Sequence, residues 1–539
     1  MSDLSLSSNN LTFMDNSKIV FTGLCDVRDT SKVDISMSRM FTEEIINDFI
    51  ILPNEQAPIH QITKVDVKNT ILNYKVLESP GSDTEAFVKN NGNKNVTGKI
   101  LSVSGVVCLD ITYIPTDTAV NSEIIFNGKL AFTSYIVAPK TTLLTDKFDV
   151  VCCVQRINII SIEHFNINLS ASFTLGAKSN QNPDEVIPNG CSCSSSDPLI
   201  INGVTPGNIL KNVITSQDKI WNQVSFSRNI ILPNNLLNAK SVTLISSSIK
   251  VISQKVILAP PLNPPVKNYY GEILLGKKLA IETVLAQKIV YIADNPQNTK
   301  HSLIINLPFS CYIIIPDEIA LDQKYKINAY IEDLYSCCLN ERTLLSGAIL
   351  FFKAKEIKSC VSICPKASSC SCLNNFNIKY NINNLCDLRK IPLIPIRGTW
   401  SKIAIYRRVD LSTNNMVKSI ESVSVTLKII SINLISTPTS RNAESAEGFT
   451  LNGLVCVVDG YLVTNIAYIS KNAIGSVITR DVYIPFSLFA AMIEEPIPNR
   501  SKLVVDACLE DFFINILDDN GIGVYAKLFT LLSIVRFTP

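Results

Sequence analysis

The sequence predicts an all-β, mainly antiparallel protein made of three tandem β-sandwich-like domains. Three observations support this fold class. Short Ile-, Val- and Leu-rich runs alternate with polar residues at a period of two, they are bounded by Asn, Gly, Pro and Asp, and the same landmarks recur about every 178 residues. The chain of 539 residues is 46% hydrophobic and only 18% charged, against a usual charged share of about 25%. This composition predicts several large cores.

The repeat is defined by three landmarks. A Tyr lies inside an apolar alternation, a Phe follows 18 or 19 residues later, and a Gln or Glu follows the Phe after 23 or 24 residues. The landmark residues of the three copies are Tyr113, Phe132 and Gln155; Tyr291, Phe309 and Glu332; Tyr468, Phe486 and Glu510. Each copy spans about 140 residues, which is enough to bury a core of its own.

These spacings predict the domain organisation. The predicted segments are an N-terminal arm at 1–40, β-domains at 41–180, 217–358 and 398–539, and Cys-containing linkers at 181–216 and 359–397. Helical periodicity is weak throughout, and "FTEEIINDF" at 41–49 is the best candidate for a short helix. The arm contains strand-like "LTFMDNSKIVFTGL". Three alternatives stay open for it: a strand that adds to the sheet of a neighbouring copy, a strand that completes its own first domain, or a disordered tail.

No motif indicates catalysis. The histidines, His60, His164 and His301, lie near no nucleophile signature, and we interpret them as surface or strand-end residues. Successive strand side chains point to opposite faces, so the adjacent acids Glu332–Asp333 and Glu510–Asp511 are expected to form no catalytic pair. The sequence predicts no enzyme, no cofactor and no small-molecule substrate.

Charge and hydropathy exclude other classes. A net charge of +2 without a basic stripe argues against a nucleic-acid partner. No apolar run approaches the roughly 20 residues of a membrane span. The stretch "MSDLSLSSNN" lacks the positively charged and apolar regions of a secretory signal peptide, so we expect synthesis in the cytoplasm. Any disulfides are then expected to form later, in an oxidising environment.

The 16 cysteines fall into groups. Those in apolar strand segments are expected to be small buried hydrophobes: Cys108, Cys152, Cys153, Cys311, Cys456 and Cys508. The adjacent pair Cys337–Cys338 stays unassigned.

The remaining cysteines are our candidates for disulfide cross-links: Cys25, Cys191, Cys193, Cys360, Cys364, Cys370, Cys372 and Cys386. "CSC" at 191–193 and at 370–372 lies one repeat apart, and Cys25, without a local partner, is expected to form an intermolecular bond. Zinc stays open for the second linker, although its spacing fits no standard zinc motif; we predict no metal site.

The second copy, with "IVYIA", "KHSLIINLPFS" and "YIEDL", resembles the SPOCS domain of spore-coat and spore-envelope proteins of Bacillus- and Clostridium-type bacteria. The third copy matches through "IAYIS", "YIPFS" and "CLEDF"; in the first, Ala131 replaces the Pro before the Phe. No LysM module is recognisable, unlike in some members of the family.

The resemblance implies structural work at the endospore surface, in coat, exosporium or appendage. We expect a self-assembling protein made in the mother cell, hardened by disulfides, whose partners are its own copies and other spore-surface proteins. A scaffold that binds a coat morphogenetic protein without polymerising is the alternative.

Overall fold

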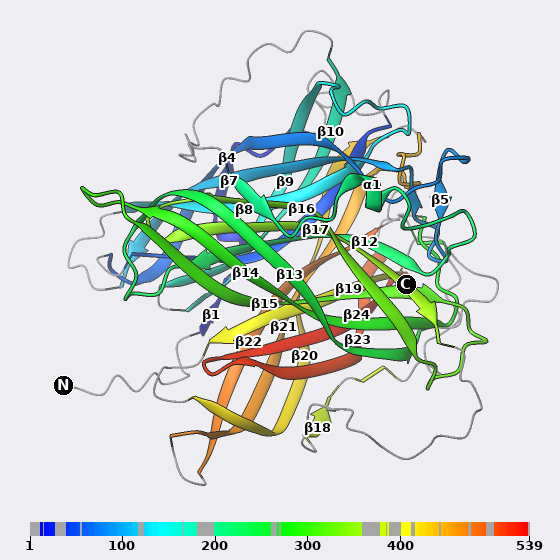
Figure 1. Cartoon of the computed structure of the whole chain (residues 1–539). Helices are drawn as coiled ribbons and strands as arrows, with labels where there is room; N and C mark the ends of the chain where they lie inside the picture. The colour runs from blue at the N-terminus through cyan, green and yellow to red at the C-terminus, as the bar shows by residue number, and fades with distance from the viewer. Residues whose placement is uncertain are drawn as a thin grey trace.

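The structure is a computed structural model of the chain. It describes the following residues: 11–14, 16–26, 39–53, 56–116, 123–163, 165–180, 199–259, 267–268, 271–357, 378–383, 385–386, 400–410, 416–440, 443–472, 476–491 and 501–536. The molecule is almost wholly β, and most strand pairs are antiparallel (Figure 1), which confirms the predicted fold class. We describe it as three units.

Unit 1 covers residues 11–179 and forms two main sheets, with strand orders β2-β4-β7-β8 and β1-β9-β10-β3, and a small hairpin of β5 and β6. Its elements are β1 Leu11–Phe13, the 3₁₀ helix η1 Asn16–Lys18, β2 Val20–Thr22, β3 Phe41–Ile51, β4 Ile59–Glu78, β5 Val88–Lys89, β6 Asn95–Val96, β7 Lys99–Pro115, β8 Ile124–Val137, β9 Phe148–Glu163 and β10 Asn166–Ser179.

Unit 2 covers residues 200–356, with sheets β11-β13-β14-β15 and β12-β17-β16. Its elements are β11 Ile200–Asn202, α1 Gly207–Leu210, β12 Trp221–Ile231, β13 Ala239–Leu258, β14 Lys277–Ala293, β15 Lys300–Ile315, β16 Tyr325–Cys338 and β17 Thr343–Glu356.

Unit 3 covers residues 379–536, with sheets β18-β20-β21-β22 and β19-β24-β23. Its elements are β18 Lys379–Ile382, β19 Trp400–Asp410, β20 Val417–Thr439, β21 Asn452–Ser470, β22 Val477–Ala491, β23 Ser501–Asp518 and β24 Gly521–Arg536. The strand order therefore repeats from unit to unit.

Each unit is held by its own apolar core between its two sheets. The landmark residues belong to these cores, since the three Tyr and three Phe side chains are all buried. Gly105 and Gly460 lie opposite Phe132 and Phe486 on the neighbouring strand, and each Phe ring covers its glycine closely enough that a Cβ would clash with it. The Tyr and Phe landmarks of the repeat thus mark residues that pack in the core between the two sheets of each unit.

The segment 41–49 is a strand, so the expected helix is wrong. All of β3 pairs in antiparallel register with β10, and the side chains of Ile46, Asp48 and Ile50 are buried at the period of a strand. Tertiary pairing of the β-branched residues overrides the weak helical signal.

The arm and the linkers also contribute strands. β1 pairs with β9 and β2 pairs in parallel with β4, so the described part of the arm completes unit 1, which is one of the three alternatives for it. β11 and β18 lie within the ranges predicted as linkers, and each pairs in parallel with the long strand of the unit that follows, β13 or β20. Each unit therefore begins earlier than the repeat landmarks indicate.

Candidate functional site

The three units close into a ring. In Figure 1 β4, β7, β9 and β10 of unit 1 are labelled toward the top, β13, β14 and β15 of unit 2 cross the middle, and β20, β21 and β22 of unit 3 are labelled toward the bottom, with orange strands of unit 3 running upward behind the others. The edge strand β8 lies against β12, β15 lies against β19, and β22 returns to lie against β3 of unit 1. Each unit thus contacts both others.

The contacts across the three seams are made by equivalent residues. Asn47, Ser227 and Tyr406 are each the seventh residue of β3, β12 and β19. The Asn47 side chain donates to the carbonyl of Ser487 at 3.1 Å and accepts from its N–H at 2.7 Å. The Ser227 hydroxyl does the same with Thr133, at 3.2 and 2.6 Å.

At the third seam, the Tyr406 ring packs on Phe309, with 5.0 Å between the ring centroids. The ring therefore has approximate threefold symmetry, with different chemistry at each seam.

A second set of seam contacts comes from a β-bulge that all three units share. The ladders skip Gln155, Glu332 and Glu510, the third landmark of the repeat. A bulge turns two successive side chains toward one face of the sheet.

Both members of each acidic pair therefore face the neighbouring unit. The Glu332 carboxylate accepts from the hydroxyl of Ser79 at 2.8 Å and from the amide of Gln223 at 2.6 Å. Asp333 accepts from Ser102 at 2.5 Å and pairs with Lys75 at 2.7 Å. The expectation that the two side chains point to opposite faces is wrong because the bulge breaks the alternation.

The residue after the bulge forms an ion pair across every seam. Asp333 pairs with Lys75, Asp511 with Lys255 at 2.8 Å, and Arg156 with Asp459 at 2.9 Å. In unit 3 the bulged residue Glu510 also pairs with Lys278 at 2.6 Å, with both side chains excluded from solvent. Burial raises the pKa of Glu332 to about 7, against its two hydrogen bonds, with a further rise from Asp333.

Two disulfides lie at equivalent places in units 1 and 3. Cys25 is bonded to Cys153, and Cys386 to Cys508, with Cα–Cα distances of 5.2 and 5.0 Å. The expectation that Cys25 forms an intermolecular bond is wrong, because the fold brings Cys25 next to Cys153 of the same chain. Cys153 and Cys508, expected as small buried hydrophobes, are both disulfide-bonded.

The other cysteines divide as follows. Cys108, expected as a buried hydrophobe, is also disulfide-bonded. Cys152, Cys311 and Cys456 are buried free thiols, as expected. The candidate cross-link residues Cys191, Cys193, Cys360, Cys364, Cys370 and Cys372 lie outside the described residues.

In unit 2, the positions equivalent to the disulfide cysteines of units 1 and 3 are occupied by other residues. The N–H of Cys25 donates to Val154, that of Cys386 to Leu509, and that of Thr205 to Ile331, each at 2.8 Å. Thr205 therefore takes the place of Cys25 and Cys386. Tyr330, which precedes Ile331, takes the place of Cys153 and Cys508.

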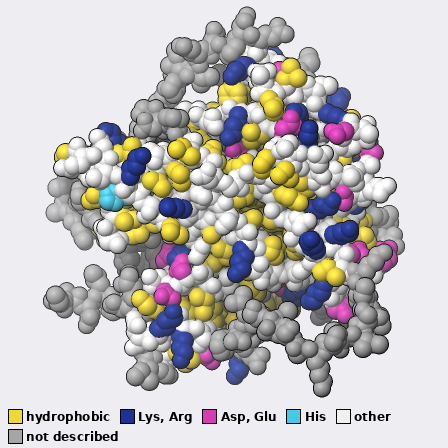
Figure 2. All heavy atoms as spheres, in the orientation of Figure 1, with side chains coloured by type: hydrophobic (Ala, Val, Ile, Leu, Met, Phe, Trp, Pro, Cys, Tyr) yellow, Lys and Arg dark blue, Asp and Glu magenta, His cyan; other side chains and the backbone are white. Residues whose placement is uncertain are grey.

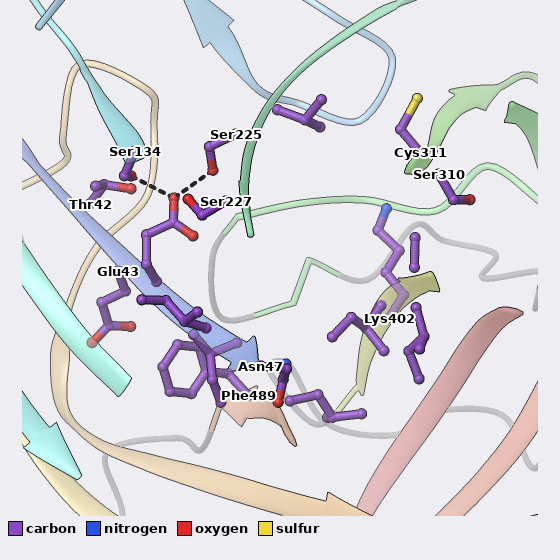
Figure 3. Close-up of a pocket in the computed structure, with 18 of the residues that line it drawn as sticks. Thr42, Glu43, Asn47, Ser134, Ser225, Ser227, Ser310, Cys311, Lys402 and Phe489 are labelled. Atoms are coloured by element: carbon purple, nitrogen blue, oxygen red, sulfur yellow. Dashed lines mark hydrogen bonds between the residues drawn. The ribbon is translucent and has the colours of Figure 1, made fainter. Parts of the chain in front are cut away.

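A cavity of about 410 Å³ lies where the three units meet. Its walls come from β3, β12 and β19 and from the edge strands β8, β15 and β22. On one wall Glu44 accepts hydrogen bonds from Ser134 at 2.7 Å and Ser225 at 3.2 Å, and Lys402 extends from another wall (Figure 3). Burial raises the pKa of Glu44 against these two bonds, and burial lowers the pKa of Lys402 to about 7 against the attraction of Glu272.

Three equivalent turns close one side of the cavity. Each contains a residue with positive φ, Asn93 at 72°, Gly271 at 76° and Gly448 at 98°. The Asn93 side chain donates to the Gly271 carbonyl at 2.6 Å, and a Cβ at Gly271 would lie only 3.0 Å from the Gly448 carbonyl oxygen. The turns also carry charges, since Lys94 lies 3.5 Å from Glu447 and 3.9 Å from Glu272.

Other residues considered for chemistry lie apart. His60 is exposed, while His301 contacts Thr299 at 2.9 Å and stacks on Tyr291; His164 is outside the described residues. Among the residues described, no group of three or more His, Cys, Asp or Glu is placed to hold a metal ion. No described helix has the length and apolar character needed to cross a membrane. Lys and Arg side chains are scattered singly over the face in Figure 2.

The chain matches no family model, and it matches neither a curated protein nor a solved structure.

Proposed function

We propose that this chain is a non-enzymatic structural protein of the bacterial endospore surface, a member of the SPOCS-type proteins, that assembles with its own copies. The observation that carries the proposal is the closed ring of three β-units with buried ion pairs at its seams and disulfides in units 1 and 3. Rigid bodies of this kind suit a load-bearing building block. The resemblance of "YIEDL" and "CLEDF" to the family supports the location.

In this proposal the protein is made in the mother-cell cytoplasm and ends in the coat, exosporium or an appendage. The disulfides of Cys25 and Cys386 stabilise the single molecule. In this proposal, bonds between copies come from candidate cysteines within 191–193 and 360–372.

Purified, air-oxidised protein tests the proposal by negative-stain microscopy and by gels run with and without reductant. We expect ordered polymers and a ladder of covalent oligomers that reductant collapses. A variant with Ser at the six candidate cysteines should lose the ladder, while a Cys152→Ser control, at a buried free thiol, should keep it. Monomers under all conditions would contradict self-assembly and favour the adaptor alternative.

A further inference from the structure

The central cavity holds the buried amine of Lys402. Among the residues that the structure describes, no group forms a hydrogen bond with Lys402 Nζ. Its nearest groups are the Tyr312 ring, with the centroid at 4.3 Å, and a Glu272 carboxylate oxygen at 3.7 Å, which is beyond hydrogen-bond length. Burying an ammonium group without a hydrogen-bond acceptor costs free energy, so the Lys402 site favours binding of a ligand that brings an acceptor.

The wall of the cavity that carries Glu44 favours a hydrogen-bond donor, whereas Lys402 favours an acceptor. Ser134 and Ser225 both donate to Oε1 of Glu44, and neither bonds Oε2. The Glu44 carboxylate and the lone pairs of the two hydroxyl oxygens can accept hydrogen bonds, and they favour a group that donates hydrogen bonds and carries positive charge. The labelled residues Ser134 and Ser225 lie on one side of the cavity in Figure 3, and Lys402 lies on the other.

The rest of the lining is suited to a small organic molecule. The cavity volume of about 410 Å³ falls in the range of about 300–1,000 Å³ that is usual for ligand sites. Apolar side chains, among them Ile45, Ile403 and Phe489, also line the cavity. The three walls come from three different units, so the site exists only in the closed ring.

We propose that this cavity binds a small zwitterion of the amino-acid class. Its carboxylate pairs with Lys402 Nζ and its ammonium group with Glu44, and its side chain lies against the apolar part of the lining. This ligand site goes beyond the structural role proposed above and does not depend on it.

The test uses the full-length, oxidised protein and the twenty L-amino acids as probes. Each is tested at millimolar concentration by saturation-transfer NMR, and the strongest binder is titrated by calorimetry. That amino acid is then compared with its analogue lacking the amine and its analogue lacking the carboxylate. We expect binding of at least one amino acid, and at least a tenfold loss of affinity for each analogue.

Variants locate the site. Lys402→Met and Glu44→Gln should each weaken binding at least tenfold, whereas Lys250→Met, at an exposed lysine of β13, should leave it unchanged. Thermal unfolding checks that each variant folds, and the analogue comparison needs no variant at all. Binding of none of the twenty, equal binding of both analogues, or full binding by both cavity variants would overturn the proposal, leaving a water-filled cavity.

Discussion

Glu332 shows how a single position of the repeat acquires a different role in each unit. Its equivalents are Gln155, which contacts Thr174 of its own unit, and Glu510, which pairs with Lys278 of the neighbouring unit. Among the described contacts, the donors to Glu332 are the neutral groups of Ser79 and Gln223, and Asp333 lies beside it. Because burial is the largest influence on the Glu332 carboxyl and these donors are uncharged, its protonated form is favoured.

The free energy of unfolding should therefore depend on pH through Glu332. Its pKa is about 7 in the folded chain and near 4.5 when unfolded, so the folded state binds the extra proton between these values. This contribution is fully present below pH 4.5 and is lost as the pH rises through 7, by about 3 kcal/mol. Glu332→Gln should flatten the profile over this window in urea unfolding at pH 5, 6, 7 and 8.

The control for this prediction is Glu85→Gln, at an exposed carboxylate of unit 1. It should keep the wild-type pH profile. An unchanged profile in Glu332→Gln would show that other carboxylates, such as Asp48 or Glu447, cause the dependence.

At the scale of elements, each disulfide links two parts of one unit. It joins the segment that follows the parallel strand, β2 or β18, to the strand that carries the β-bulge, β9 or β23. Cys25 follows β2 and is tied to β9, and Cys386 follows β18 and is tied to β23. After β11, the equivalent contact to β16 is only the hydrogen bond from Thr205 to Ile331. Unit 2 therefore lacks a covalent tie at this place.

Thr205→Cys with Tyr330→Cys should form a third disulfide in unit 2, because the backbone contact is the same as at the native bonds. A disulfide that closes the long loop between residues 205 and 330 is expected to raise the free energy of unfolding by about 2–4 kcal/mol. Mass spectrometry after alkylation would detect the bond, and denaturant unfolding would measure the gain. Thr205→Ser with Tyr330→Ser removes the same side chains without a bond and should be less stable than wild type. Free thiols at both positions after oxidation would contradict the equivalence.

The Lys278–Glu510 pair connects β14 to β23 across the seam between units 2 and 3. Lys278→Met leaves Glu510 buried without its cation and should lower the free energy of unfolding by about 3–5 kcal/mol. Adding Glu510→Leu should recover most of this loss, because the uncompensated charge is gone. Denaturant unfolding of the double-mutant cycle measures both effects.

The neighbouring lysine supplies the control for this cycle. Lys277 contacts Asp317, whose side chain is exposed, so Lys277→Met should cost less than about 1 kcal/mol. Equal losses from Lys277→Met and Lys278→Met would indicate that burial of the pair has no special role.

At the scale of the whole molecule, the sequence predicted the units but not their closure. Tyr113, Tyr291 and Tyr468 could be found because each reports on a core within its own copy. Asn47 and Ser487 are 440 residues apart and belong to different copies, so periodicity holds no information about their contact. The bulge at Glu332 and the pairing of Cys25 each lie within one copy and were missed for other reasons. The bulge interrupts the regular alternation on which the sequence pattern relies, and Cys25 lies 128 residues before its partner Cys153.

Asp459 connects units 3 and 1 through a buried ion pair. Its carboxylate is buried and accepts from Arg156 of unit 1 at 2.9 Å, and from Ser431 and Ser487 of its own unit, each at 2.6 Å. Asp459→Leu removes the acceptor and leaves the Arg156 guanidinium uncompensated at the seam. We expect a loss of about 3–5 kcal/mol in the free energy of unfolding.

The loss should also be local to one seam. Hydrogen exchange should rise in β3 and β22, which form the seam between units 3 and 1, and change little in β8 and β12, which form the seam between units 1 and 2. Asp481→Leu is the matched control, since this exposed carboxylate of β22 accepts only from Asn465 of the same unit among the described contacts, and it should alter neither quantity. If Asp459→Leu accelerated exchange equally at all three seams, the ring would open as one cooperative body, because loss of one seam would then release the other two.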